Sequence, residues 1–376
     1  MFDKLTSRRA HFLILVLAVL LTSCSTPSMI TPAPQSSTTL VPTVEIASVP
    51  ASEIDAYLNT LVHLGSFSGS VLIARNGEVF LTKGYGFADR EQEISNTPQT
   101  KFRLGSITKQ FTAMAIIILE AQDKLDVQDP VCKYLTECPE AWETITIHHL
   151  LTHTSGIPNF TDFPDYQRTM ATPSPPEETI NRFKDKALDF RPGERWSYSN
   201  SGYIVLGHIV ERVSGQSYEE FLQERIFTPL DMRDTGYDHN QDDLAIGYKS
   251  IFSKADFIDM SIPFAAGGLY STVEDLYKWD QALYTKQLLP QDYLDRIFAA
   301  HVAIPNANGM SYGYGWMVGL EDSRQIITHG GGIEGFVTNI ARYPQDKTVI
   351  IVLSNQQYTS MGIIQPELVK KVFNRR

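Results

Sequence analysis

The 376-residue chain has few cysteines, a deficit of basic side chains and a single long apolar run. Three cysteines are too few for the disulfide framework of a small secreted scaffold. The 32 basic and 43 acidic side chains give a net charge of −11, which argues against nucleic acid as a partner. With 43% apolar residues the chain is neither disordered nor fibrous. Its length alone corresponds to about two or three domains.

The apolar run occupies residues 12–21 and follows three basic side chains. It is shorter than the ~20 residues of a membrane-spanning helix and has the form of a secretory signal peptide. It ends in Leu-Thr-Ser-Cys24, which resembles a bacterial lipobox; this resemblance implies cleavage after residue 23 and lipidation of Cys24. The alternative is an ordinary signal peptide, or an uncleaved anchor, with Cys24 there by chance. Removing residues 1–23 takes away three basic and one acidic side chain, so the net charge becomes −13.

Residues 24–50 begin with the predicted lipidated cysteine and are rich in proline, serine and threonine. Glu45 is the only charged residue of this segment, and large apolar side chains are too few to build a core. The composition predicts an extended tether. We therefore expect one folded domain over residues 51–376, outside the cytoplasm. A lipid would anchor it to the outer face of the cell membrane, or it would lie in the periplasm or at the outer membrane.

The other two cysteines, Cys132 and Cys138, are six residues apart. In the oxidising compartment that export implies, this spacing favours a local disulfide that stabilises the fold by about 2 kcal/mol at most. Two unpaired thiols are the alternative. Neither their spacing nor their neighbours match a zinc site. His148, His149 and His153 have no acidic ligand beside them, so we predict no metal and no cofactor.

The ends of the domain read as strands and its middle as helices. Asn76-Gly77 separates two β-rich runs within residues 69–84 and predicts a hairpin. Further strands are expected at residues 325–329, 336–343 and 348–353, and a closing helix at 365–373. These elements predict an α+β fold. Its antiparallel sheet combines N- and C-terminal strands flanked by helices, and a mostly helical subdomain covers roughly residues 125–300.

Ser106 lies just ahead of residues 108–122, which are apolar nearly all round and predict a buried helix. Lys109 follows one turn later, so both side chains share a face. A serine hydroxyl needs a base or a positive field to act as a nucleophile, and a partly desolvated lysine can titrate low enough to accept its proton. The alternative is a helix cap followed by a surface lysine.

Two further motifs carry polar groups suited to a substrate. Tyr198 and Asn200 are two residues apart, so they point the same way in an extended loop, unless Asn200 only caps the next helix. His329 and the glycines that follow it lie at a predicted strand end, where glycine lets a substrate approach the backbone. The alternative there is a flexible hairpin with a solvent-facing His329.

In this order, Ser-x-x-Lys, Tyr-x-Asn and His-Gly-Gly resemble the serine β-lactamase and penicillin-binding-protein superfamily. Within it, the chain is similar to the class C β-lactamase-related branch of D,D-peptidases and esterases (peptidase S12-like), here as a bacterial lipoprotein. The resemblance implies that Ser106 is acylated and that Lys109 and Tyr198 handle its proton, with the immediate base left open. Asn200 would bind the acyl-side amide.

The resemblance also places the oxyanion hole at the backbone N–H groups of Ser106 and Gly332, and substrate contacts at His329 and Gly331. Class C β-lactamases have Lys-Thr-Gly where this chain has His329-Gly330-Gly331, which argues against an efficient β-lactamase. We expect His329 to titrate near neutral pH unless it is strongly perturbed, so that activity depends on pH.

These features imply a serine hydrolase that forms an acyl-enzyme on amide, peptide or ester bonds. D-amino-acid peptides of cell-wall type and carboxylic esters rank ahead of β-lactams as substrates. The alternatives are a penicillin-binding lipoprotein with little turnover, a weak β-lactamase, or a purely structural surface protein.

Overall fold

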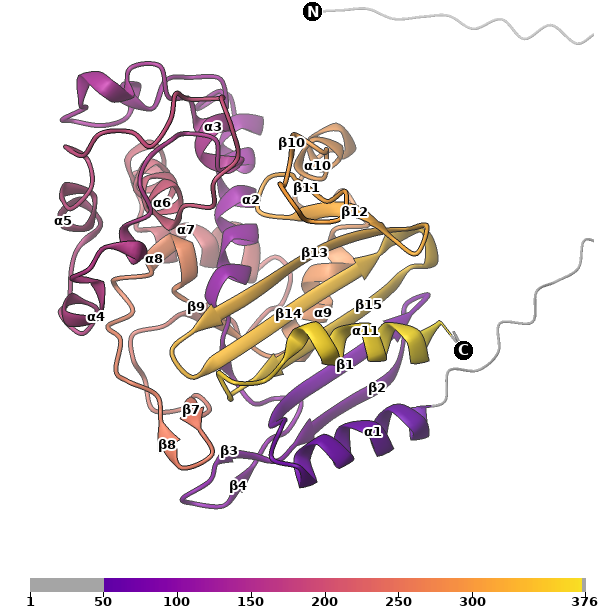
Figure 1. Ribbon diagram of the computed structural model, residues 1–376. Coiled ribbons are helices and arrows are strands. Elements are labelled where there is room, and N and C mark those ends of the chain that lie inside the picture. Colours follow the sequence, from indigo (N-terminus) through magenta and orange to yellow (C-terminus); the bar gives the residue numbers. More distant parts are fainter. Residues whose placement is uncertain (1–50, 374–376) are drawn as a thin grey trace, which may run out of the picture. The chain divides into compact units, whose positions relative to one another are not determined.

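The computed structural model describes residues 51–373, so the predicted signal peptide, Cys24 and the tether lie outside the described residues. An eight-stranded antiparallel sheet forms the centre of the described chain (Figure 1). In order across the sheet the strands are β10 (Val302–Ala303), β11 (Ser311–Tyr312), β12 (Met317–Glu321), β13 (Arg324–Ile333), β14 (Phe336–Tyr343), β15 (Thr348–Ser354), β1 (Gly69–Arg75) and β2 (Glu78–Tyr85). Because β1 pairs with β15, the two ends of the domain meet in one sheet, as predicted.

The turn between β1 and β2 is the predicted hairpin. Asn76 and Gly77 have φ values of 54° and 81°, which fit the type I′ turn that Asn-Gly favours. Beyond the five predicted strands, the sheet gains β10, β11 and β12 at the edge beside β13. Strand β13 runs to Ile333, so the His-Gly-Gly motif lies within the strand and not at its end.

One face of the sheet is covered by the terminal helices α1 (Ala51–His63) and α11 (Met361–Val372), as Figure 1 shows. Successive side chains of a strand point to opposite sides of the sheet, so alternate residues of β1 belong to different apolar cores. Val71 and Ile73 join the core under α1 and α11, whereas Leu72 belongs to the core on the other face. The sheet therefore separates two apolar layers.

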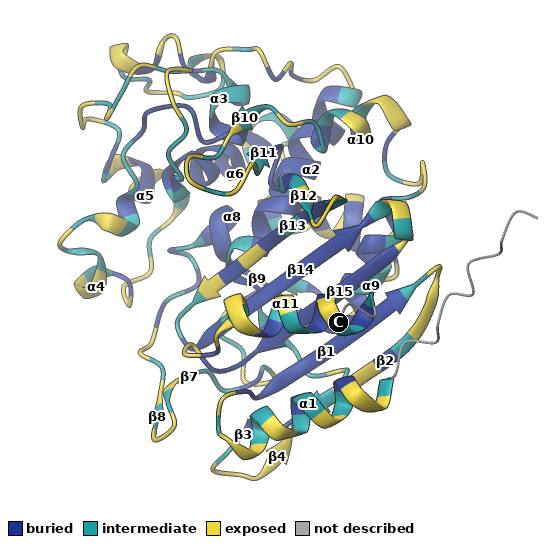
Figure 2. Cartoon of the chain, turned by 45° about the vertical axis from the view of Figure 1, so that its right-hand side comes forward, coloured by how far each residue is buried: buried dark blue, intermediate teal, exposed yellow. Residues whose placement is uncertain are grey.

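The second face packs on helix α9 (Val273–Ala282), which contacts β1 and β15. The core on this side contains helix α2 (Thr108–Ala121), in which every residue from 108 to 120 is buried, as predicted from its composition (Figure 2). The predicted helical region surrounds it. Its helices are α3 (Ile147–Leu151), α4 (Tyr166–Thr169), α5 (Pro176–Asn181), α6 (Asn200–Ser214), α7 (Tyr218–Leu222), α8 (Phe264–Gly267), α9 (Val273–Ala282) and α10 (Gln291–Ile297). Short strands complete the fold: β3 (Phe87–Asp89), β4 (Ile94–Ser95), β5 (Phe102–Arg103), β6 (Gly236–Tyr237), β7 (Tyr248–Ser250), β8 (Ser253–Lys254) and β9 (Leu269–Ser271).

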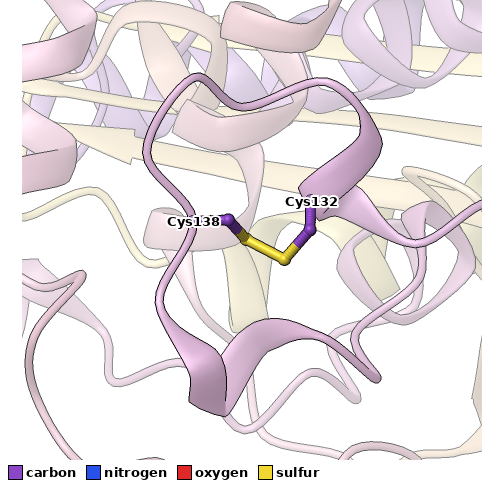
Figure 3. The surroundings of a disulfide bond; sticks show 2 residues. All are labelled: Cys132 and Cys138. Carbon is purple, nitrogen blue, oxygen red and sulfur yellow. A yellow bond between two sulfur atoms is a disulfide. The ribbon is translucent and has the colours of Figure 1, made fainter.

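A disulfide bond joins Cys132 to Cys138 in the helical region (Figure 3). The loop that it closes follows a bridge between Pro130 and Thr146, so the backbone on one side of the loop is also held by strand-like pairing. Among the helices of residues 51–373, none has the length and apolar character to cross a membrane.

Candidate active site

Ser106 lies in a single 3₁₀ turn, Gly105–Ile107, that leads directly into α2. Leu104, just before the turn, is fixed from two sides. Its N–H donates to the Leu269 carbonyl of β9 at 2.8 Å, and its carbonyl accepts the Thr338 hydroxyl of β14 at 2.7 Å. The serine is thus mounted between the central sheet and the three-stranded sheet that contains β9.

Glycines let strand β13 pass directly beside this turn. A Cβ atom at Gly331 would lie 1.9 Å from the Leu104 carbonyl oxygen, so any side chain there would displace the strand. A Cβ atom at Gly105, whose φ is +54°, would lie 2.9 Å from the backbone N of Gly332. The two predicted oxyanion residues, Ser106 and Gly332, therefore belong to adjacent segments, and both line one cavity.

Lys109 is fully buried at the bottom of the site. Its Nζ lies 3.1 Å from Ser106 Oγ, 2.8 Å from Asn200 Oδ1 and 2.8 Å from the Ala266 carbonyl oxygen. Burial lowers the pKa of the amine well below its ordinary value, because the charged form loses its hydration. The alternative of a surface lysine is wrong.

Tyr198 lies over the same lysine, with Lys109 Nζ 4.8 Å from its ring centroid. Burial raises the pKa of the phenol, and its interaction with Ser106 opposes that rise only in part. Tyr198 and Asn200 thus reach Lys109 from one side, as their spacing predicts.

His153 fixes the loop that carries Tyr198, and the sequence did not identify it as a site residue. Its carbonyl accepts the Ser197 N–H at 2.9 Å, and its Nδ1 accepts the Ser199 N–H at 3.2 Å. Its ring stacks at an angle on Tyr198, with centroids 4.2 Å apart. The only sequence signal was its place in Leu-Leu-Thr-His-Thr-Ser-Gly, which the resemblance treats as structural.

Asn200 is the first residue of α6 and half-buried in the cavity wall. Its N–H donates to Asn159 Oδ1 at 2.9 Å, and its Nδ2 donates to Thr161 Oγ1 at 3.2 Å. Because Oδ1 faces Lys109, the amide presents its N–H donors on the Thr161 side. Ser199, and not Asn200, is the N-cap of the helix.

His329 and Gly331 lie beneath the cavity wall instead of in it. The imidazole is 2% exposed, with Nε2 2.9 Å from the Tyr312 hydroxyl and Nδ1 2.6 Å from the Gly330 carbonyl oxygen. Gly331 is packed against Leu104. Neither residue lines the cavity beside Ser106, so the substrate contacts at these two residues stay a prediction that the cavity wall does not support.

The expected titration of His329 near neutral pH is corrected. Burial lowers the pKa of His329 to about 4. The alternative of a solvent-facing histidine in a flexible hairpin is wrong, since Tyr312 covers the ring.

The cavity beside Ser106 has a volume of about 430 Å³. Ser106, Asn200 and Gly332 form its polar side, and Glu334 adds a carboxylate. Its apolar wall consists of Phe160, Ile258, Pro263, Ile333, Phe336 and Val337. The cavity can hold an acyl group with an apolar side chain next to the serine.

His148 and His149 have structural partners. His148 Nδ1 lies 2.8 Å from the Tyr314 hydroxyl, and His149 Nδ1 accepts the Thr146 N–H at 3.1 Å in the capping box of α3. Within residues 51–373, no group of three or more histidine, cysteine or acidic side chains is arranged to hold a metal ion.

A buried lysine beside a serine at the start of the central helix, with a glycine strand alongside, defines a serine hydrolase of the β-lactamase/transpeptidase-like fold. The profile of the Beta-lactamase family matches residues 54–372, and the chain belongs to this family.

Relatives with known names support the same assignment. The chain is 34% identical to the penicillin-binding protein PbpX of Bacillus subtilis (strain 168) over 305 residues, which cover 80% of this chain and 73% of PbpX. It is 28% identical to penicillin-binding protein 4* of the same organism over 81% of this chain and 71% of that protein.

Solved structures agree on the fold. The octameric penicillin-binding protein homologue from Pyrococcus abyssi superposes with a TM-score of 0.79 at 28% identity, covering 87% of this chain and 78% of that one. A D-stereospecific amidohydrolase from Streptomyces sp. gives 0.73 at 25% identity, over 84% and 97%. D-amino acid amidase from Ochrobactrum anthropi SV3 gives 0.76 at 24% identity, over 86% and 99%, and shows the fold alone.

Proposed function

We propose that this protein hydrolyses amide, peptide or ester bonds of D-amino-acid compounds through an acyl-enzyme at Ser106. The observation that carries the proposal is the position of Lys109 Nζ, fully buried and 3.1 Å from Ser106 Oγ. A buried, hydrogen-bonded amine beside a serine hydroxyl is the arrangement that an activated nucleophile requires.

Lys109 is the group that we assign as the immediate base. Burial favours its neutral form, which has two N–H donors and one lone pair. Asn200 Oδ1 and the Ala266 carbonyl oxygen, neither of which can donate, would take the two N–H groups. The lone pair is then left for the Ser106 proton, and the freed Oγ attacks the substrate carbonyl.

Tyr198 is assigned to the leaving group. Its raised pKa keeps the phenol protonated, so it can give its proton to a departing amine and regain one from Lys109. The backbone N–H groups of Ser106 and Gly332 would hold the oxyanion, where losing one donor typically costs roughly 10²–10³ in rate. Water attacking the acyl-enzyme would reverse these proton transfers.

The third motif supports amides and esters over β-lactams. Position 330 has no side chain, and the His329 imidazole is buried and uncharged at neutral pH. The motif therefore offers neither the cation nor the hydroxyl that helps class C β-lactamases to bind the drug's carboxylate. The name of the Streptomyces D-stereospecific amidohydrolase supports a D-configured substrate.

A turnover panel tests this function. Nitrocefin, p-nitrophenyl esters and D-Ala-D-Ala peptides are each incubated with wild type and with Ser106→Ala. We expect turnover of the esters or of the D-amino-acid peptides, little of nitrocefin, and none in Ser106→Ala. Equal rates for wild type and Ser106→Ala on every substrate would refute the acyl-enzyme.

A second candidate is a penicillin-binding protein with little turnover, which the names PbpX and penicillin-binding protein 4* favour. Labelled penicillin distinguishes the two. Stable labelling of Ser106, with release slower than one turnover per hour and no ester hydrolysis, would favour this candidate over the hydrolase.

For the location, we propose a lipoprotein held outside the cytoplasm through Cys24. The support is the basic and apolar N-terminus that ends in Leu-Thr-Ser-Cys24. Expression in a bacterial host with labelled palmitate should label wild type and not Cys24→Ala. Equal labelling of both, or of neither, would refute lipidation at Cys24.

A further inference from the structure

A second cavity of about 790 Å³ adjoins the cavity at Ser106. The two share Glu334 and Phe336 in their walls. Glu334 lies in the short connection between β13 and β14, two residues after Gly332. A group that extends from the serine toward the second cavity therefore passes this carboxylate.

The basic side chains of the second cavity already have acidic partners. Three of them line its wall, and each forms an ion pair of 2.7 or 2.8 Å. The pairs are Lys101 with Asp243, Arg103 with Asp238, and Lys254 with Glu91. These cations are thus largely neutralised before any ligand arrives.

Glu334 has no such partner. Within residues 51–373 it forms no ion pair, and its only hydrogen bond is with its own backbone N–H. Among the described residues, the charge of Arg103 favours its ionised form and that of Asp256 opposes it. The Arg103 guanidinium is already bound to Asp238 and Asn240. Burial raises the pKa of the carboxyl group, because the ionised form loses hydration that no cationic partner replaces.

We propose that Glu334 binds the α-ammonium group of the acyl donor, so that the enzyme favours D-aminoacyl substrates with a free amine over N-acylated ones. This inference rests on the proposed function. The cavity supports the reach: Glu334 follows Gly332 by two residues in the turn after β13, and both residues line the cavity beside Ser106. If Gly332 holds the substrate carbonyl, the carboxylate can meet an amine on the adjacent carbon.

The cavity also accommodates the rest of such a substrate. Phe160, Ile258 and Phe336 offer an apolar surface for its side chain. Asn200 lies in the polar part of the same cavity. An acyl donor with an apolar side chain and one positive charge therefore matches both the wall and its unpaired carboxylate.

Two esters that differ only at the amine test the inference: D-phenylalanine p-nitrophenyl ester and its N-acetyl derivative. The ratio of their kcat/KM values is measured at pH 7.5 in each variant. Because the ammonium alters the intrinsic reactivity of the ester, the ratio in a variant is compared with the ratio in wild type. Errors in active-enzyme concentration and general structural damage cancel in such a ratio.

Glu334→Gln should lower the free-amine to N-acetyl ratio at least tenfold, mainly through KM for the free-amine ester. Asp243→Asn is the matched control, because it removes one negative charge from the second cavity, where Asp243 is already paired with Lys101. It should leave the ratio within about twofold. Glu334→Lys should reverse the preference in favour of an N-succinyl ester.

An unchanged ratio in Glu334→Gln, or an equal fall in Asp243→Asn, overturns the inference while the proposed function stands. Mass spectrometry of the quenched reactions identifies the other failure. If neither ester places an acyl group on Ser106 in wild type, the proposed function fails and the inference fails with it.

Discussion

Lys109 and His329 are two buried basic side chains of one site, and their surroundings differ. Burial lowers the pKa of both. Lys109 Nζ reaches Ser106 Oγ, which opens onto the cavity. Both ring nitrogens of His329 are occupied, one by Tyr312 and one by the Gly330 carbonyl.

This difference distinguishes a side chain that can take part in the reaction from one that supports the structure. Nδ1 of His329 donates to a carbonyl, so its Nε2 accepts from the Tyr312 hydroxyl and the ring is satisfied as a neutral group. Lys109 has a third contact, to a hydroxyl that can itself donate. A lowered pKa therefore does not identify a catalytic group unless an atom of that group also reaches the reacting centre.

Lys109→Met should give the largest effect of a substitution outside the nucleophile. Without the base, kcat/KM for a p-nitrophenyl ester should fall roughly 10³–10⁴-fold. Lys133→Met is the control, because Lys133 is an exposed lysine paired with Asp129 and should keep full activity. Circular dichroism checks that both variants fold. If the kcat/KM of Lys109→Met stays within tenfold of wild type, the assignment of this lysine as the base is contradicted.

Tyr198→Phe should lower kcat/KM for an amide roughly 10²-fold, and less for a p-nitrophenyl ester, because an amine needs a proton to leave and a nitrophenolate does not. The ring would still stack on His153, so the loop should keep its place. Tyr277→Phe, a change at an exposed hydroxyl that bonds the Gly77 carbonyl, serves as control. An equal loss on both substrates would contradict the assignment to the leaving group.

His329→Gln should have a smaller effect, about tenfold or less in kcat/KM. Since the pKa of folded His329 is about 4, its ionisation should leave the activity profile flat between pH 6 and 8. An inflection near pH 6.5 in wild type that disappears in the variant would contradict this.

The same pKa predicts a stability change. The unfolded chain protonates His329 near its ordinary pKa of about 6.5, and the folded chain only near 4. Between these values the unfolded state binds more protons, so the free energy of unfolding falls as the pH is lowered. Urea unfolding at pH 7.5 and pH 5 should show a smaller drop in His329→Gln than in wild type.

Removing the disulfide should have the smallest effect on activity. Cys132→Ser combined with Cys138→Ser opens a short loop of the helical region, at a cost of about 2 kcal/mol in the free energy of unfolding. The kcat/KM should stay within about twofold of wild type. A large loss of activity with unchanged unfolding would link this loop to the site.

Local patterns in the sequence predicted much of the fold. The Asn76-Gly77 turn and the uniformly apolar helix from residue 108 are confirmed, because each depends on neighbouring residues only. Strands β10 and β11 were missed, since two-residue strands carry too little periodicity to detect. The five-residue strand β12 was missed as well.

In the candidate site, too, the features that depend on neighbouring residues were the ones that could be predicted. Spacing alone placed Ser106 and Lys109 on one face and pointed Tyr198 and Asn200 in one direction. The burial of His329 could not be predicted, because the residue that covers it, Tyr312, comes from β11, which is two strands away from β13 in the sheet. Glu334 was missed for a similar reason, since its lack of a partner depends on ion pairs made by residues far along the chain.

The central claim is that a neutral Lys109 activates Ser106. Its most direct test is the pH dependence of Ser106 labelling by a fluorophosphonate. Mass spectrometry follows the adduct in wild type and Lys109→Met. The account predicts that wild type labels at its full rate at pH 7, far below the ordinary lysine pKa of about 10.4, and that Lys109→Met labels at least 100-fold more slowly. Labelling that rises only toward pH 10, or that is equal in the two proteins, would contradict it.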